Sequence, residues 1–141
     1  MVIGDLDGTG AEKLAASLNN PRVTGVQMDV TSESSWKQAV KTCMDKFGRI
    51  DIVVNNAGTT YRSKPTLDVT EEEYMRVFDV NVKSVFWSVK IALPIMVEQG
   101  EGGSLINISS VGSTRPRPGL VWYNASKGAV SNVSLSRTVY V

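Results

Sequence analysis

The sequence contains no histidine and only one cysteine, Cys43. Without histidine, and with a single thiol, the usual ligand sets of a zinc site are absent, and an internal disulfide framework cannot form. Cys43 lies in an amphipathic helical pattern, which favours buried packing over redox chemistry. We therefore expect no metal site and a reducing, cytoplasmic environment.

Charge and hydropathy give no sign of two further classes of partner. Lys and Arg number 15 against 14 Asp and Glu, so the net charge of +1 carries no signal for nucleic acid or another polyanion. No uninterrupted apolar run reaches the 18 residues of a membrane-spanning helix, and no signal-peptide pattern opens the chain. We expect a single soluble domain with no nucleic-acid or membrane partner.

Strand-like and helical patterns alternate along the chain. Thr70 and Glu73 form a capping-box pattern that opens a helix toward Phe78. Such alternation predicts a parallel sheet with helices on both faces, an α/β, doubly wound, Rossmann-like fold. The expected strands are residues 1–5, 23–28, 50–54 and 105–108, and the other expected helices are 10–18, 33–47, 81–98 (interrupted by Pro94) and one from about Trp122.

Ser110, Tyr123 and Lys127 have the spacing Ser-x12-Tyr-x3-Lys. On a helix Tyr123 and Lys127 lie one turn apart on the same face, although such a pair alone also occurs on ordinary surface helices. The lysine charge would lower the pKa of Tyr123 from about 10 toward about 7, making the phenol an acid/base near neutral pH. Ser110, at the end of an apolar strand, can hydrogen-bond a substrate oxygen. These groups indicate carbonyl/alcohol redox chemistry with hydride transfer to a cofactor.

Further motifs accompany this constellation in a fixed order. The run Asn55-Asn56-Ala57-Gly58 follows an apolar strand, where ligands of parallel sheets bind. Asp29 ends another strand-like run, and Asn81 precedes a long apolar helix. With YNASK, these motifs resemble the short-chain dehydrogenase/reductase family, in particular its 3-oxoacyl-(acyl-carrier-protein) reductase-like branch. The resemblance covers essentially all 141 residues.

The resemblance implies a role for each matching residue. Tyr123 would exchange a proton with the substrate oxygen of a small carbonyl or alcohol substrate, Lys127 would lower its pKa and hold the nicotinamide ribose, and Ser110 would steady the carbonyl. Asn81 would hold a water in the proton relay. The cofactor-binding residues would be Asn56, Ala57 and Gly58 against the cofactor, and Asp29 and Val30 near the adenine.

The glycines between Gly4 and Gly10 imitate a dinucleotide-binding loop. Two acidic residues inside that loop would face the pyrophosphate, and the NNAG motif follows about one βα unit, roughly 25 residues, too early. We therefore interpret residues 1–5 as the family's second strand, with Asp5 at its carboxyl end. A carboxylate there accepts ribose hydroxyls and repels a 2′-phosphate, which predicts NAD rather than NADP.

On this alignment the family's first βα unit and its carboxyl-terminal part are missing, so residues 1–141 form one partial dinucleotide-binding and catalytic domain. Loss of the first strand would open the middle of the sheet. Two functions are compatible with the sequence. One is an NAD(P)-dependent oxidoreductase. The alternative is a truncated, non-catalytic fragment that associates with a full-length relative.

Two surfaces complete the expectations. The loops 59–68 and 111–122 carry basic residues that could meet an anionic acyl thioester, although ordinary solvated surface is the more frequent explanation. The helix from Asn81 is apolar on more than one stripe, which fits burial in one subunit as well as contact with a second subunit, and the family resemblance implies a homodimer or homotetramer. The residues behind these two expectations are Arg62, Lys64, Arg115 and Arg117 in the loops, and Val82, Val85, Phe86, Val89, Leu93 and Met96 on the helix.

Overall fold

A computed structural model describes residues 1–136 of the chain. Two compact units make up the structure, and the chain passes between them more than once. The first unit contains Met1–Val53 and Trp87–Ser104, and the second contains Val54–Phe86 and the described residues from Leu105 onward. The residues expected to carry the chemistry are therefore divided between two separate packing units.

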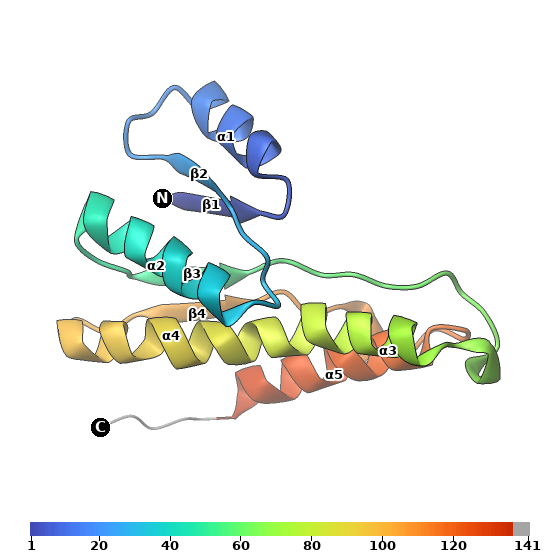
Figure 1. Cartoon of the computed structure of the whole chain (residues 1–141). Helices are drawn as coiled ribbons and strands as arrows, with labels where there is room; N and C mark the ends of the chain where they lie inside the picture. The colour runs from blue at the N-terminus through green and yellow to red at the C-terminus, as the bar shows by residue number, and fades with distance from the viewer. Residues whose placement is uncertain (137–141) are drawn as a thin grey trace. The chain divides into compact units, whose positions relative to one another are not determined.

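The first unit opens with a parallel strand–helix–strand motif, formed by β1 (Val2–Asp5), α1 (Gly8–Ser17) and β2 (Thr24–Gln27). Val2 lies opposite Thr24 and Asp5 opposite Gln27, so both strands end at the same edge. Helix α1 packs close to β2 (Figure 1), and Gly25 permits this because a Cβ there would clash with the backbone of Ala11. The two carboxyl ends place the loops after β1 and β2 side by side.

Helix α2 (Glu33–Phe47) has the bounds that the sequence predicts. Ser32 caps its first turn by accepting from the Ser35 amide at 3.3 Å. Its carboxyl end is Gly48, whose φ of 74° is the left-handed conformation that favours glycine. Cys43 is half-buried on this helix, and burial raises the pKa of its thiol.

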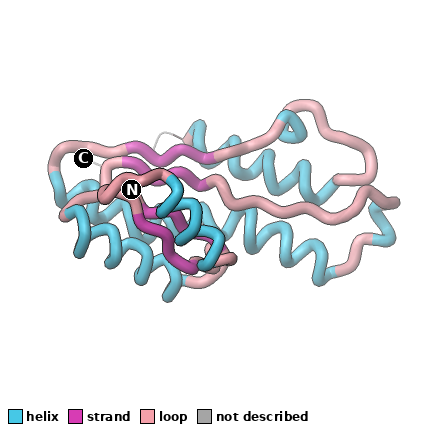
Figure 2. Tube along the Cα trace, turned by 90° about the horizontal axis from the view of Figure 1, so that it is seen from above, coloured by secondary structure: helices cyan, strands magenta, loops and turns pink. Residues whose placement is uncertain are grey.

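Strands β3 (Ile52–Asn55) and β4 (Ser104–Asn107) form a second two-stranded sheet. The pairing is parallel, because the Ser104 amide donates to Asp51 and the Ile108 amide donates to Asn55. Figure 2 shows the two strand pairs in magenta. Among the described residues β1 and β3 each have one hydrogen-bonded neighbour, as expected for an incomplete doubly wound sheet.

The two helices that the sequence predicts in this region, one opening at Thr70 and one from Asn81, are continuous in the structure. Thr70 and Glu73 form the predicted capping box at the start of α3 (Glu71–Phe78). A π-helical turn (Asp79–Lys83) then leads directly into α4 (Ser84–Gln99), so the prediction of a helix beginning at Asn81 was wrong. No breaker separates Phe78 from Asn81, and the widened turn accommodates one extra residue within a continuous helix.

Helix α4 also continues through Pro94, where the sequence predicted an interruption. Pro94 is exposed, so the carbonyl that loses its helical donor need not be buried. The whole run Glu71–Gln99 is long and apolar enough to span a membrane, by length and composition alone, with a mean hydropathy of 1.4 over 18 residues. Core helices of soluble proteins meet the same criterion.

The second unit is completed by α5 (Val121–Leu135), which lies beside α3 (Figure 1). Between β4 and α5 the chain forms a short 3₁₀ turn at Val111–Ser113 and a loop containing two prolines. The face of α5 toward the unit's interior carries Asn124, Ser126, Lys127 and Val130. Three of these four buried side chains are polar, which is unusual for a helix in a packed interior.

Candidate active site

Tyr123 and Lys127 lie in the first two turns of α5, one turn apart as the spacing predicts. Lys127 is only 5% exposed, and its Nζ donates to the backbone oxygen of Ile108 at 2.8 Å. Tyr123 is half-buried. A buried ammonium next to a partly accessible phenol is an arrangement that general acid–base chemistry can use.

Ser110 stands at the start of the 3₁₀ turn that follows β4. Its Oγ accepts from the Gly112 amide at 3.1 Å, which uses a lone pair and leaves the hydroxyl proton for another acceptor. The Ser113 hydroxyl donates to the Ser110 carbonyl at 2.7 Å and tightens the same turn. The Ser110 hydroxyl therefore still has its proton available to a further acceptor.

Asn81 is 2% exposed and sits within the π-helical turn. Its Oδ1 accepts from the Thr59 amide at 2.7 Å, and its Nδ2 donates to the Thr59 oxygen at 3.0 Å and to Ser126 Oγ at 2.9 Å. Both amide protons are thereby engaged. The side chain connects the segment after β3 with α5, and the second lone pair of its Oδ1 is the acceptor that the predicted water could use.

The NNAG motif brings the second unit's functional residues together. Asn55 ends β3 and donates to Asn107 Oδ1 at 2.8 Å, and Asn56 and Ala57 are exposed directly after it. A Cβ on Gly58 would stand 3.3 Å from Lys127 Nζ and 3.5 Å from Asn81 Oδ1. Gly58, Asn81 and Lys127 therefore converge on one point, although they come from three separate motifs.

The remaining predicted cofactor residues belong to the first unit. Asp5 ends β1 and accepts from the Asp7 amide at 2.9 Å. Asp29 Oδ1 accepts from both the amide and the hydroxyl of Thr31, at 2.9 and 2.8 Å, and the Val30 oxygen accepts from Trp36 Nε1 at 3.0 Å. These residues lie after the carboxyl ends of two parallel strands, in loops held by their own hydrogen bonds.

Asp7 bears on the interpretation of the glycines near the start of the chain. Its carboxylate caps α1 by accepting from the Gly10 amide at 3.0 Å. A carboxylate therefore occupies the helix N-terminus where a dinucleotide loop would receive a pyrophosphate. This favours the alignment in which β1 is the family's second strand.

The structure divides the four basic loop residues into two groups. Lys64 Nζ contacts both oxygens of Glu73, at 2.7 and 2.9 Å, and this ion pair favours a structural explanation of its charge over contact with an anionic substrate. Arg62, Arg115 and Arg117 are exposed. The ion pair, with a hydrogen bond from the Thr70 amide, lowers the pKa of Glu73.

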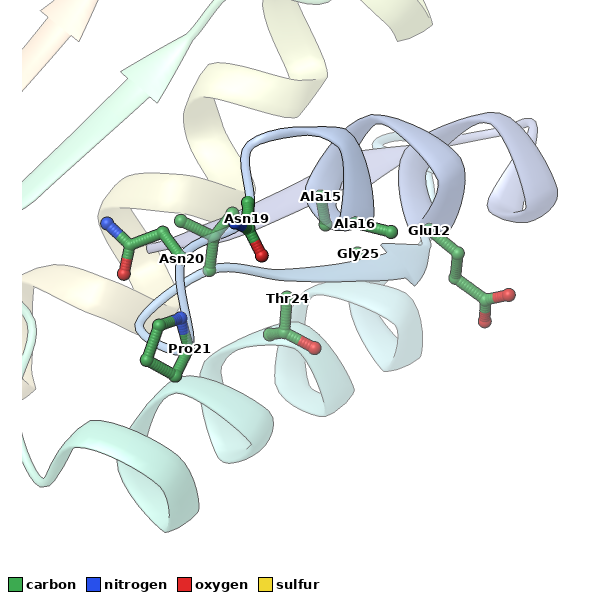
Figure 3. A pocket seen from close by; sticks show the side chains of 9 residues that line it. Glu12, Ala15, Ala16, Asn19, Asn20, Pro21, Thr24 and Gly25 are labelled. Carbon is green, nitrogen blue, oxygen red and sulfur yellow. The ribbon is translucent and has the colours of Figure 1, made fainter.

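Two open pockets occur among the described residues. One, of about 560 Å³, lies beside the carboxyl-terminal half of α1 in the first unit (Figure 3), and no predicted site residue lines it. The other, of about 550 Å³, lies in the second unit between the loop after Ser110 and the first turns of α5. Its lining includes Gly112, Arg117 and Asn124, so it borders the loop that the sequence assigns to the substrate.

Sequence reasoning did not identify Tyr61, Asn124 or Ser126 as site residues. Ser126 links Asn81 to α5, and Asn124 Nδ2 donates to the Arg117 oxygen at 2.9 Å. The Tyr61 hydroxyl accepts from the Trp122 amide at 3.0 Å. A signal existed only for Asn124 and Ser126, because both lie inside the YNASK motif.

Comparison with known proteins identifies the family. The family profile described as short chain dehydrogenase matches residues 1–139. The chain belongs to the short-chain dehydrogenase family. A family relative, 4-formylbenzenesulfonate dehydrogenase of Comamonas testosteroni, is 46% identical over 80% of this chain and 44% of its own length. Galactitol 2-dehydrogenase of Agrobacterium fabrum is 35% identical over 96% of this chain and 52% of its own length.

Solved structures of short-chain dehydrogenases show the same fold. The 3-ketoacyl-(acyl-carrier-protein) reductase from Brucella melitensis, complexed with NADH, has a TM-score of 0.89 at 37% identity, over 94% of this chain and 55% of that one. A short-chain dehydrogenase/reductase from Burkholderia phymatum, in complex with NAD, has a TM-score of 0.90 at 28% identity, over 94% and 48%. The chain thus spans about half the length of the relatives it matches.

Proposed function

We propose that this short-chain dehydrogenase transfers a hydride between a nicotinamide cofactor and a carbonyl or secondary alcohol substrate. The observation that carries the proposal is the convergence of Gly58, Asn81 and Lys127, with Tyr123 one turn away on α5. These residues come from motifs separated by up to 70 positions, and a surface Tyr–Lys pair would not need such surroundings.

The residues present fit a nicotinamide cofactor. Lys127 has three N–H donors, and the Ile108 oxygen takes one of them, which leaves two for ribose hydroxyls. Gly58 keeps the space over Nζ open, because a side chain there would begin 3.3 Å from the ammonium. A nicotinamide held against these residues supplies or accepts the hydride.

Tyr123 and Ser110 act on the substrate oxygen. In the direction of reduction, the carbonyl carbon gains the hydride while its oxygen takes the proton of the Tyr123 hydroxyl, which yields the alcohol and a phenolate. Solvent then returns the proton to the phenolate. Ser110 donates its hydroxyl proton to the same oxygen as a hydrogen bond and stabilises the negative charge that develops there.

Asp5 leads us to propose NAD as the cofactor. It is exposed at the carboxyl end of β1, where a carboxylate favours ribose hydroxyls over a 2′-phosphate. The two solved neighbours hold NADH and NAD, whereas a curated relative from Lentilactobacillus kefiri is an NADP-dependent alcohol dehydrogenase. Cofactor choice in the family therefore varies, and the charge at Asp5 is the local feature that favours NAD.

We also propose that the protein forms a homodimer or homotetramer through α4. Phe86 and Val97 on this helix are each 51% exposed, which is a large apolar area for a helix that also contributes to the interior. A folded monomer in analytical ultracentrifugation at micromolar concentration would remove this proposal.

The test of the proposed activity is Tyr123→Phe, which removes only the phenolic oxygen. With NAD⁺ and galactitol, or with NADH and 4-formylbenzenesulfonate or acetoacetyl-coenzyme A, we expect the variant to lose at least about a hundredfold in kcat, the lower end of the range for a lost general acid. NADH binding, followed by fluorescence titration, should stay within about twofold, because Lys127 and Gly58, which would hold the cofactor, are unchanged. Tyr74→Phe is the matched control, and turnover by Tyr123→Phe equal to that of the control would refute the assignment.

The alternative function, a non-catalytic chain that associates with a full-length relative, is favoured by one observation. Strands β1 and β3 each pair on one side only among the described residues, so each has one edge with no neighbouring strand, where a strand of another chain could pair. This alternative predicts no NADH binding by the purified chain, and co-purification with a co-expressed relative. Micromolar NADH affinity of the chain alone would contradict it.

A further inference from the structure

Helix α5 begins without a capping side chain of its own. Its N-cap residue is Leu120, which offers no side-chain acceptor to the first-turn amides. One of these amides, that of Trp122, instead donates to the Tyr61 hydroxyl at 3.0 Å. Tyr61 is 4% exposed, so its hydroxyl forms this bond away from solvent. A residue 61 positions away therefore performs the task of a local helix cap.

The segment around Tyr61 is bound to the approach to α5 at a second point. The Lys64 amide donates to the Gly119 oxygen at 3.2 Å, so residues 61–64 and 119–122 run antiparallel with two connections between them. Gly119 has a φ of 74°, and a Cβ there would clash with Ser63. Close contact of the two segments thus depends on glycine at this position.

Tyr123 lies between this contact and the hydrogen bonds that connect Asn81 with Ser126. On one side the preceding amide, at Trp122, is held by Tyr61. On the other side the Tyr123 carbonyl accepts from Ser126 Oγ at 2.7 Å, and Ser126 Oγ in turn accepts from Asn81 Nδ2 at 2.9 Å. The backbone around the phenol is therefore held by Tyr61 at the Trp122 amide, and at the Tyr123 carbonyl through Ser126, whose hydroxyl is bound by Asn81 outside α5.

We propose that Tyr61 is a positioning residue for Tyr123. Its hydroxyl caps α5 at Trp122 and thereby fixes the place of the phenol relative to Ser110 and Lys127. The catalytic part of this inference rests on the proposed dehydrogenase function. The positioning of Tyr123 is a property of the fold and is measurable without turnover.

The experiment compares Tyr61→Phe with Tyr74→Phe. Tyr61→Phe keeps the buried ring and removes the cap. Tyr74→Phe makes the same chemical change on the ring that packs edge-on against Trp122, with ring centroids 5.2 Å apart. It leaves the hydrogen bond from the Trp122 amide to Tyr61 in place. Circular dichroism first tests whether both variants are folded. Three quantities are then measured in each: exchange of the Trp122 amide, the ring resonance of Tyr123 in ¹³C-tyrosine-labelled protein, and kcat with KM.

For Tyr61→Phe we expect Trp122 amide exchange to rise about tenfold or more, since a lost hydrogen bond of about 1.4 kcal/mol gives that factor. The Tyr123 resonance should shift, and kcat should fall about ten- to a hundredfold with KM within about twofold, because a misplaced acid affects the chemical step more than binding. Tyr74→Phe should change none of these quantities appreciably.

An unchanged Tyr123 resonance in Tyr61→Phe overturns the inference, and so does an unchanged kcat in an active protein. If the wild-type chain has no turnover, but exchange and resonance respond as expected, positioning by Tyr61 is supported and the proposed dehydrogenase function fails. The two failures are thereby distinguished.

Discussion

The two units of this short-chain dehydrogenase bury different kinds of side chain. Among the described residues, the first unit encloses mainly apolar groups, namely Ala11, Ala15, Met28, Trp36, Ile50, Ala92 and Met96, with Ser88 as a buried polar residue. The second encloses Asn55, Asn81, Ser84, Asn124, Ser126 and Lys127 alongside Tyr61, Val77, Val85 and Val130. The polar interior belongs to the unit that carries the proposed chemistry.

This difference has an energetic meaning. Apolar burial stabilises by about 25 cal/mol per Å² and depends mainly on area and volume. A buried polar group stabilises only when its hydrogen bonds are made, and it costs about 1–3 kcal/mol when they are not. The second unit should therefore tolerate less change in side-chain chemistry, and in return it holds polar groups in fixed positions.

The largest effect is expected in the apolar interior of the first unit. Trp36 is 7% exposed, and its Nε1 donates to the Val30 oxygen. Trp36→Ala should reduce the free energy of unfolding by about 3–5 kcal/mol, as for other buried aromatic truncations. Urea denaturation followed by circular dichroism measures this loss.

The control for that variant is Trp36→Phe, which keeps most of the ring and removes the indole donor. It should cost less than Trp36→Ala, near the value of about 1 kcal/mol for a single hydrogen bond, with a further term for the lost ring area. Equal losses for the two variants would mean that the hydrogen bond, not apolar burial, dominates in the first unit. The comparison between units would then fail.

The second prediction tests the polar interior of the second unit by a change of chemistry at nearly constant volume. Asn81→Leu removes the partners of both backbone groups of Thr59 and of Ser126 Oγ. We expect a loss of about 2–4 kcal/mol, because both backbone groups of Thr59 lose these bonds and Ser126 Oγ keeps only its bond to the Tyr123 oxygen. The same urea denaturation experiment gives the value.

The matched change in the first unit is Met28→Leu, at a residue that is 7% exposed. A volume-conserving apolar swap of this kind costs less than about 1.5 kcal/mol. If Asn81→Leu is tolerated as well as Met28→Leu, volume rather than hydrogen bonding holds the second unit together.

Sequence patterns predicted the parts of the fold that depend on neighbouring residues. Helix α2 has its predicted bounds because Ser32, the helical apolar spacing and Gly48 all act within a few positions of one another. The capping box at Thr70 is local in the same way. The pair Tyr123 and Lys127 was predictable because one turn of helix fixes their relation.

The parts that could not be predicted depend on distant partners. No residue pattern marks the π-helical turn at Asn81 in the sequence. In the structure its Asn81 side chain is hydrogen-bonded to Thr59 and Ser126, which are distant along the chain. Lys64 has the charge of a substrate-binding residue, but Glu73 on the next helix pairs with it. Nothing in the sequence distinguishes Tyr61 from other tyrosines in loops. Its role becomes visible only in the structure, where its hydroxyl accepts from the Trp122 amide.

The smallest effect is expected from carboxylates at the starts of two helices, one in each unit. Glu73 of α3 is paired with Lys64, and their side chains are 22% and 28% exposed. Glu33 of α2 is paired with Lys37, and these side chains are 46% and 65% exposed. Glu73→Gln should lower Tm at pH 7 more than Glu33→Gln does, because a solvated i,i+4 pair contributes little.

The pH dependence of the Glu73 variant follows from the direction of its pKa shift. The hydrogen bond from Lys64 holds the pKa of Glu73 below its ordinary value, so the folded state releases this proton more easily than the unfolded state does. The stabilisation is therefore complete above the unfolded pKa of about 4.3 and is lost as pH falls through the lower folded value. The Tm difference between wild type and Glu73→Gln should be constant from pH 7 to about 5 and shrink below about 4. A difference that instead grew on acidification would mean that Glu73 is stabilised in its protonated form, and that Lys64 is available to a substrate after all.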